Sequence, residues 1–263
     1  MPYSDIIVEV HEGVATITLN RPDRLNAFAE RMREELREAI EESAGREDVN
    51  VIVITGAGRG FCTGADVAHL REIAERGDEA SLREQVEAGQ AVVLAIREAR
   101  QPVIASVNGP AAGAGASLAL ACDLRIAAES ASIGLTFNRI GLHPDWGATY
   151  TLPRLVGPAM AAELIFTGAM ISARDGLRLG IFNRVVTDER LAEETGGLAR
   201  DLAAKPALPL YLAKRAMQRS LEASLREMLD FEMEAQLQCG RSADAREGIE
   251  AFVEKREPRF GRR

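Results

Sequence analysis

The chain is poor in the residues that build metal centres and disulfide frameworks. Its 263 residues include three cysteines and three histidines. Cys62, Cys122 and Cys239 are far apart and form no Cys-x-x-Cys pair, so neither a zinc-ligand spacing nor a disulfide framework is indicated. We therefore expect no bound metal, and we expect Cys62 and Cys122 to be small buried side chains.

The sequence also lacks an apolar run of the ~18 residues that a membrane-spanning helix needs. Its N-terminal residues show no basic region, apolar segment or cleavage site of a secretion signal. Acidic residues outnumber basic ones by 40 to 32, and the net charge of −8 disfavours nucleic acid as the main partner. These absences favour a cytoplasmic protein with no membrane or nucleic-acid partner, although local arginines and lysines can still bind an anionic ligand.

The N-terminal part of the chain is patterned as strands followed by a helix. Residues 6–10 and 14–20 alternate apolar and polar side chains around a short turn, which predicts a hairpin. Apolar side chains at helical spacing predict a helix over 28–43. Residues 51–54 are all apolar, as is typical of a strand that is covered on both faces.

The pattern then occurs a second time. A charged segment, 67–85, leads into a helix expected near 86–99, and three shorter elements follow: a strand over 102–107, a helix over 113–121 and a strand over 124–127. Two strand–glycine–helix units in succession indicate an α/β fold with a coiled ββα core rather than a doubly wound sheet.

From about residue 153 onward the pattern is helical. The expected helices cover residues 158–167, 172–178, 189–203, 207–238 and 243–255. We predict two parts, a ββα core over residues 1–200 and a C-terminal helical lid or assembly region over residues 201–263.

Two glycine-rich loops follow like strands and can leave backbone N–H groups free to face a ligand. Residues 56–60 (Gly-Ala-Gly-Arg-Gly) follow the strand near 51, and residues 113–115 (Gly-Ala-Gly) open a small-residue helix. The first loop has neither the G-x-G-x-x-G spacing nor the GKS or GKT of a phosphate-binding loop. Taken singly, each loop is equally compatible with a tight turn or close packing, but the two together indicate a ligand site.

A third stretch, residues 141–147 (Gly-Leu-His-Pro-Asp-Trp-Gly), places the carboxylate of Asp145 beside Trp146 in a turn. Two sources of free N–H groups and one placed carboxylate suit chemistry at the carbon next to an acyl carbonyl. The donors hold the oxyanion while the carboxylate moves a proton. The structural alternative is that Asp145 caps a helix that begins near Gly147.

Four stretches together resemble the crotonase superfamily, the enoyl-CoA hydratase/isomerase family: residues 21–28, 61–67, 108–123 and 244–256. The resemblance covers nearly the whole chain. It implies a spiral ββα core with a C-terminal helical region, and a homotrimer or dimer of trimers. It also implies an acyl-CoA thioester substrate, with coenzyme A as part of the substrate and no metal or redox cofactor.

The resemblance also implies roles for individual residues. The N–H groups of Ala65 and Ala114 match the oxyanion hole. Arg24 is placed to meet the phosphates of coenzyme A, and Lys255 and Phe260 match positions that touch the adenine and ribose phosphate, often from a neighbouring subunit. The full set of matched substrate-binding and CoA-binding positions is Arg24, Leu25, Ala27, Ala65, Asp66, Val67, Gly113, Ser117, Phe137, Trp146, Lys255 and Phe260.

The resemblance fails where family hydratases carry two catalytic glutamates. Ser117 and Phe137 stand at those positions, and neither is a carboxylate. Asp145 matches the acid of several isomerases and aryl-CoA dehalogenases of the family. The motifs around it are most similar to those of phenylacetate-pathway isomerases, which rearrange ring-epoxide thioesters and shift 3-enoyl double bonds to the 2-position.

We therefore predict an acyl-CoA isomerase in which Asp145, partly desolvated by Trp146, takes and returns one proton. Three alternatives stay open: an enoyl-CoA hydratase with a non-standard site, a dehalogenase, and a non-catalytic acyl-CoA-binding scaffold. The low aromatic content of 5% disfavours the dehalogenase, and Asp145 disfavours the scaffold. The acyl group, the roles of Ser117 and His143, and closure of residues 67–85 over the ligand are left open.

Overall fold

The computed structural model describes residues 3–29 and 31–261. At its centre is a six-stranded sheet in the order β1-β2-β3-β4-β6-β9, in which only the β1–β2 pair is antiparallel. Its strands are β1 (Ile6–His11), β2 (Val14–Leu19), β3 (Val51–Gly56), β4 (Val103–Val107), β6 (Leu124–Ala128) and β9 (Arg184–Val186). A smaller sheet joins β5 (Ala111–Ala112), β7 (Ser132–Gly134) and β8 (Ile171–Ser172).

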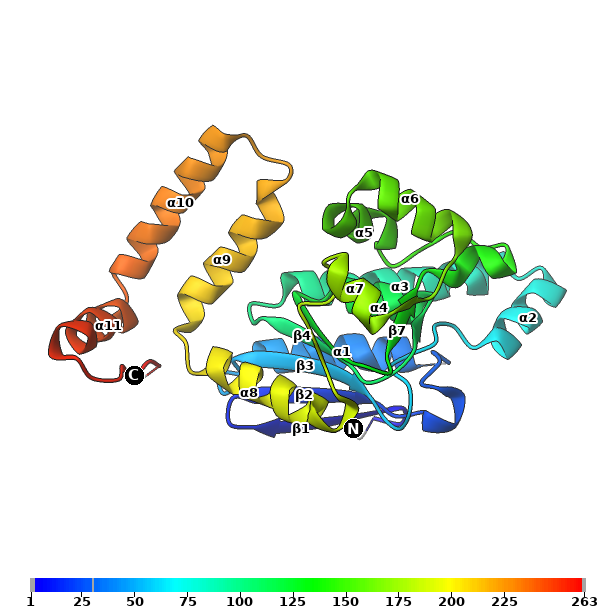
Figure 1. Cartoon of the computed structure of the whole chain (residues 1–263), viewed down its shortest axis with the longest axis horizontal. Coiled ribbons are helices and arrows are strands. Elements are labelled where there is room, and N and C mark those ends of the chain that lie inside the picture. Colours follow the sequence, from blue (N-terminus) through cyan, green and yellow to red (C-terminus); the bar gives the residue numbers. More distant parts are fainter. Residues whose placement is uncertain (1–2, 30, 262–263) are drawn as a thin grey trace.

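Helices cover the large sheet, as its apolar strands require. β4 is buried along its whole length, and the first four residues of β3 are buried too. α1 (Met32–Gly45) packs on β1, β2 and β3, whereas α8 (Leu191–Ala203) packs on β2, β3, β4 and β6. α3 (Glu79–Glu98) packs against α1 (Figure 1). The structure also confirms the predicted hairpin, as β1 and β2, and the predicted central strands, as β3, β4 and β6.

The first helix begins later than its apolar pattern predicts. We expected a helix over 28–43, but α1 begins at Met32, and Phe28 instead pairs with Ala65 in an isolated parallel β-bridge. The Phe28 N–H donates to the Gly64 carbonyl at 2.7 Å, and the Asp66 N–H donates to the Phe28 carbonyl at 3.0 Å. Hydrogen bonds to a distant loop therefore take Phe28 out of the helix, and its apolar ring is buried all the same.

The charged segment 67–85, for which no secondary structure was predicted, is mostly helical. It contains α2 (Val67–Arg76) and the first turns of α3, which begins at Glu79 rather than near residue 86. The side chains of Asp66 and Asp78 cap these two helices, and Gly77 ends α2 with φ of +61°. Short polar caps on each helix explain how so charged a segment forms helices.

The C-terminal helices extend away from the sheet (Figure 1). The single helix expected over 207–238 is two helices, α9 (Ala207–Ser220) and α10 (Leu225–Gly240), because a capping box of Ser224 and Glu227 restarts the chain. α11 (Ala243–Glu254) follows. The boundary predicted at residues 200/201 lies within α8, which still packs on the sheet.

The remaining helices lie in the middle of the chain, within the predicted core. α4 (Ala114–Ala121), α6 (Pro158–Thr167) and α7 (Ala173–Arg178) match their predicted ranges closely. α5 (Ala148–Val156), which has Pro153 inside it, is the helix near Gly147 that the capping alternative for Asp145 assumed. Cys62 and Cys122 are buried, as expected. Within the described residues no helix is long and apolar enough to cross a membrane, and no three His, Cys, Asp or Glu side chains are grouped to hold a metal ion.

Candidate active site

The two glycine-rich segments run side by side in parallel. Cys62 and Ala111 form an isolated parallel bridge, and the Ala112 N–H donates to the Cys62 carbonyl at 2.9 Å. Ala65 and Ala114 each lie three residues beyond this bridge. The equal spacing brings the two alanines together at the end of the paired segments.

The Ala65 N–H is left without an acceptor by the pairing around it. The bridge to Phe28 uses the Gly64 carbonyl and the Asp66 N–H, so the Ala65 N–H points to the other side. Across residues 3–29 and 31–261, no backbone acceptor is within hydrogen-bonding distance of it. Both carboxylate oxygens of Asp66 already have partners. Its Oδ1 accepts from the Ala68 N–H at 3.1 Å, and its Oδ2 lies 3.4 Å from the guanidinium of Arg21.

The second donor comes from the start of α4. Gly113 precedes this helix with φ of +53°, and the first helical hydrogen bond runs from the Ser117 N–H to the Gly113 carbonyl at 3.0 Å. The Ala114 N–H therefore has no acceptor inside the helix, and it lies at the positive end of the helix dipole. Ala114 itself is helical, so an alanine presents this N–H without strain.

Glycine at position 115 is required by the contact between the two segments. A Cβ there would lie 2.0 Å from the Cys62 carbonyl oxygen, which cannot move without breaking the pairing. We expect Gly115→Ala to separate the two donors and to lower the free energy of unfolding by about 2 kcal/mol or more. Denaturant unfolding and the steady-state rate measure these effects. Gly197→Ala is the matched control, because nothing lies within 4 Å of its Cβ position, and an unchanged Gly115→Ala protein would contradict the expectation.

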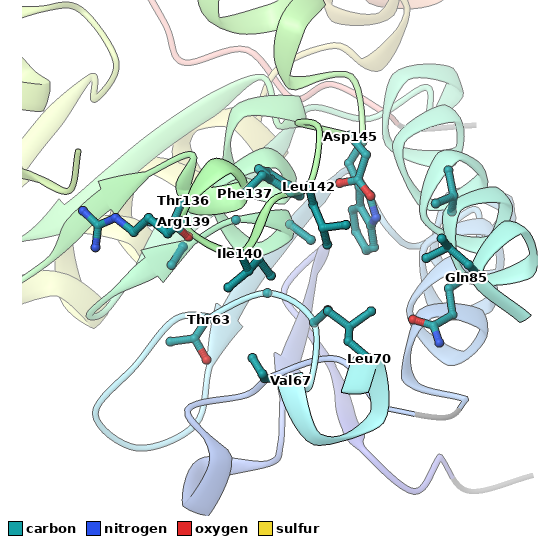
Figure 2. Close-up of a pocket in the computed structure, with 18 of the residues that line it drawn as sticks. Thr63, Val67, Leu70, Gln85, Thr136, Phe137, Arg139, Ile140, Leu142 and Asp145 are labelled. Atoms are coloured by element: carbon teal, nitrogen blue, oxygen red, sulfur yellow. The ribbon is translucent and has the colours of Figure 1, made fainter. Parts of the chain in front are cut away.

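These donors face a cavity of about 390 Å³. In Figure 2 Asp145 and Leu142 lie above it, Val67 and Leu70 of α2 lie below, and Gln85 of α3 lies at one side. Phe137 comes from a short 3-10 helix, η2 (Thr136–Ile140). Among the lining residues that the structure describes, Asp145 is the only carboxylate.

Asp145 is held in the wall as an unsatisfied acid. Its Oδ1 is buried and has no hydrogen-bond partner among the described residues. Burial raises the pKa of Asp145 to about 6, and the positive charge of Arg33 limits that rise. The capping alternative is wrong, because α5 begins at Ala148 after Gly147 as its N-cap residue, and no side chain caps it. A carboxyl group with this pKa can both accept and return a proton near neutral pH.

Trp146 keeps the Asp145 turn in place. Its backbone has φ of +52°, an uncommon conformation for a bulky residue, and its side chain is 2% exposed. The indole packs on Phe28, with ring centroids 4.7 Å apart, and covers Gly89 of α3 so closely that a Cβ there would lie 1.9 Å from the indole Nε1. Tight packing on two elements thus stabilises the strained turn that presents Asp145.

The structure brings seven of the predicted site residues to this one cavity: Ala65, Val67, Gly113, Ala114, Phe137, Asp145 and Trp146. Ser117 does not line it, because its side chain is fully buried and its Oγ donates to the Gly113 carbonyl at 3.2 Å. Arg33 and Gln85, which line the cavity, were not predicted. The only signal for Arg33 was a charge next to Met32 on the apolar side of α1.

The predicted CoA-binding residues outside the cavity lie in two places. Arg24, Leu25 and Ala27 flank Asn26, whose buried amide donates to the carbonyls of Ala57 and Gly60 at 3.0 and 2.8 Å. This bond fixes the 21–28 segment against the first glycine loop. Residues 255 and 260 follow α11, which lies at the opposite end of the molecule from α2 (Figure 1). α2 supplies Val67 and Leu70 to the cavity.

Comparison with known proteins identifies the family of the chain. A family model described as Enoyl-CoA hydratase/isomerase matches residues 9–263. The chain is 42% identical to the 1,2-epoxyphenylacetyl-CoA isomerase of Escherichia coli, with 97% of each chain covered. It is also 42% identical to a probable enoyl-CoA hydratase of Rhodobacter capsulatus, with 99% of each covered.

Solved structures show the same fold. A putative enoyl-CoA hydratase from Streptomyces coelicolor superposes with a TM-score of 0.94 at 37% identity, covering 100% of this chain and 96% of that one. An enoyl-CoA hydratase subunit from Geobacillus kaustophilus superposes with a TM-score of 0.91 at 39% identity, covering 98% of each. The chain has the crotonase fold and belongs to the enoyl-CoA hydratase/isomerase family of enzymes, which act on acyl-CoA thioesters.

Proposed function

We propose that the protein is an acyl-CoA isomerase that moves a double bond from the 3-position to the 2-position of an enoyl-CoA. One observation carries this proposal: among the described residues that line the cavity Asp145 is the only carboxylate, and it shares the cavity with the free N–H groups of Ala65 and Ala114. One acid suffices for a 1,3-proton shift. Hydration also requires an oriented water molecule, for which Ser117 and Phe137 supply no carboxylate.

In the proposed reaction the ionised Asp145 removes a proton from C2 of the 3-enoyl thioester. The electron pair moves to the thioester oxygen, which accepts hydrogen bonds from Ala65 and Ala114, each worth about 3 kcal/mol in the transition state. Asp145 then returns the proton to C4, the carbonyl re-forms and the double bond lies between C2 and C3. The carboxylate is regenerated, and no water or redox partner is consumed.

The pH dependence follows from the state of Asp145. Removal of the C2 proton requires the ionised form, and the pKa of Asp145 is about 6. We expect kcat/KM to fall about tenfold per pH unit below about pH 6 and to level off above it. Steady-state rates in buffers of constant ionic strength measure this profile. A rate that is flat down to about pH 4 would show that another group is the base.

A ring-epoxide thioester is the second candidate substrate. The Escherichia coli relative is named for a 1,2-epoxyphenylacetyl-CoA substrate and shares 42% identity over nearly the whole chain. The walls of the cavity carry Phe137 and Trp146, on which a planar ring can pack. In this reaction, too, the thioester oxygen would bind to Ala65 and Ala114.

Two assays on the purified protein separate the readings. A 3-enoyl-CoA is followed for the gain of conjugated-thioester absorbance, and crotonyl-CoA is followed for its loss. Gain with the first and no change with the second supports the isomerase. Loss with crotonyl-CoA would instead show a hydratase with a non-standard site, in line with the names of several relatives. Inactivity in both, with binding of the thioester retained, would point to the ring substrate or a scaffold.

We further propose that the C-terminal helices form a subunit interface in a homotrimer or dimer of trimers. α10 exposes apolar side chains at four-residue spacing, on Leu225, Leu229, Met233 and Leu237. Water-exposed apolar stripes of this kind usually mark an interface. A second copy could then bring Lys255 and Phe260 to coenzyme A that enters past Arg24, Leu25, Ala27 and Asp66.

A further inference from the structure

Arg33 is a buried cation in the wall of the active-site cavity. It belongs to α1, its side chain is 4% exposed, and it lines the cavity together with Asp145. Burial removes most of the hydration of the guanidinium and lowers the pKa of Arg33. An apolar side chain would fill this part of the wall without that cost, so the charge itself requires an explanation.

Packing holds the guanidinium in one place. It lies over the Phe28 ring, 5.4 Å from the centroid, and its Nη2 donates to Gln85 Oε1 at 3.4 Å. Phe28 packs in turn on Trp146, the residue after Asp145. The cation and the carboxylate are therefore held by the same group of side chains.

Three of the side chains that line the cavity each carry a buried polar atom without a hydrogen-bond partner. Arg33 Nε, Gln85 Nε2 and Asp145 Oδ1 are all buried, and none has a hydrogen-bond partner within the described part of the chain. Two of these atoms are donors and one is an acceptor. Buried groups of this kind are rare in native proteins and require an explanation, such as a role in catalysis.

The charges that act on Asp145 come mainly from Arg33. Arg33 and then His143, in the same loop as Asp145, favour the ionised carboxylate against its burial. α3 contributes no charged side chain to the cavity wall. The other charged and titratable groups that act on the pair are Glu34 on α1, Cys62 in the loop before Ala65 and His143, and Arg139 on η2 also lines the cavity.

We propose that Arg33 is a positioning residue whose buried charge keeps the Asp145 carboxylate ionised in the substrate-free enzyme. The proposal rests on the proposed function, in which Asp145 must be a base before it meets the C2 proton. Arg33 stays protonated throughout and exchanges no proton with the substrate. Without it, burial alone would hold Asp145 in the protonated form at neutral pH, and fewer enzyme molecules could start the reaction.

The test uses a readout that does not require activity. Asp145 is protonated in the folded protein up to about pH 6 but only to 3.8 when unfolded. The measured quantity is the difference in the free energy of unfolding between an Asp145→Asn variant and the same protein with Asp145. This difference begins to favour the variant as the pH rises past 3.8, and it reaches its full value above about pH 6. The pH at which it levels off reports the pKa of Asp145. Asp145→Asn is compared with Asp145 in five backgrounds: wild type, Arg33→Met, Arg33→Gln, Arg33→Lys and Arg37→Met. The last is a control at a partly exposed arginine one turn further along α1, outside the cavity lining.

We expect the levelling to occur near pH 6 in wild type, Arg33→Lys and Arg37→Met, and at least about one pH unit higher in the two neutral Arg33 variants. The acid limb of kcat/KM should move by the same amount, with activity recovering at high pH. An unmoved levelling point, or a loss of activity equal at every pH, would overturn the proposal. The wild type could be inactive on 3-enoyl-CoA while the pH at which the stability difference levels off still depends on Arg33. That result would refute the isomerase and support the role of Arg33.

Discussion

Asp145→Asn should lower kcat/KM for 3-enoyl-CoA isomerisation by about 10³-fold or more. The same carboxylate carries the proton from C2 to C4, so its loss removes both proton transfers, and positioned acid–base groups are worth about 10² to 10⁴ each. Asparagine has nearly the same shape as aspartate, so the Ala65 and Ala114 donors and the Trp146 packing should persist. Stopped-flow or steady-state absorbance of the conjugated thioester measures the effect.

Two controls distinguish lost chemistry from lost structure. Glu84→Gln changes an exposed acid on α3, next to the lining residue Gln85, and should leave the rate unchanged. Asp145→Asn should also be as stable as wild type at acid pH and more stable above about pH 6, by about 1 to 3 kcal/mol, because it removes the cost of a buried charge. Activity within tenfold of wild type would mean that Asp145 is not the proton carrier.

Lys214→Met should lower the free energy of unfolding by about 3 kcal/mol, the largest stability effect that we expect from a single side chain. Lys214 is 4% exposed, although it lies on α9 outside the sheet. Its Nζ contacts Asp123 at 2.7 Å and donates to the carbonyls of Ile96 and Gln101 at 2.9 and 3.0 Å. Methionine fills the space but leaves the Asp123 carboxylate without its cation.

The consequence should extend beyond stability to the attachment of the C-terminal helices. Lys214 joins α9 to the end of α3 and to β6, so its loss should raise amide hydrogen exchange in α9 before the sheet is affected. Lys205→Met, at an exposed lysine, is the matched control. Asp123→Asn combined with Lys214→Met should recover part of the loss, because both charges are then absent. Equal stability of Lys214→Met and wild type would show that the buried pair adds nothing.

The sequence was informative where a residue type answers a local requirement. The strands β3 and β4 are rich in β-branched apolar residues, as is typical of strands covered on both faces, and both were predicted. The two glycine loops were recognisable because glycine permits turns and close approach of the backbone, and Asp145 stood out because a carboxylate beside a tryptophan in a turn is suited to proton transfer. Ser117 shows the limit of this reasoning, since its hydroxyl could have met substrate but instead bonds to the Gly113 carbonyl within α4.

Other features depended on partners far away in the chain. Phe28 fits the apolar stripe of α1, yet hydrogen bonds to the loop at Gly64 and Asp66 place it in a β-bridge. The break between α9 and α10 lies in a segment of good helix formers, where the capping box of Ser224 and Glu227 outweighs the pattern. In both cases local propensity was overridden by hydrogen bonds that periodicity does not encode.

The sequence by itself determined the α/β class, pointed to two glycine loops and to Asp145 as a candidate acid, and carried the motifs that resemble the enoyl-CoA hydratase/isomerase family, to which the chain belongs. Each of these follows from residue types and their order along the chain. Only the tertiary structure decided that Asp145 is buried with a pKa of about 6, and that Arg33 lies in the same wall. A pKa depends on distance and burial, and residues 33 and 145 become neighbours only when α1 and the loop before α5 pack around Phe28 and Trp146.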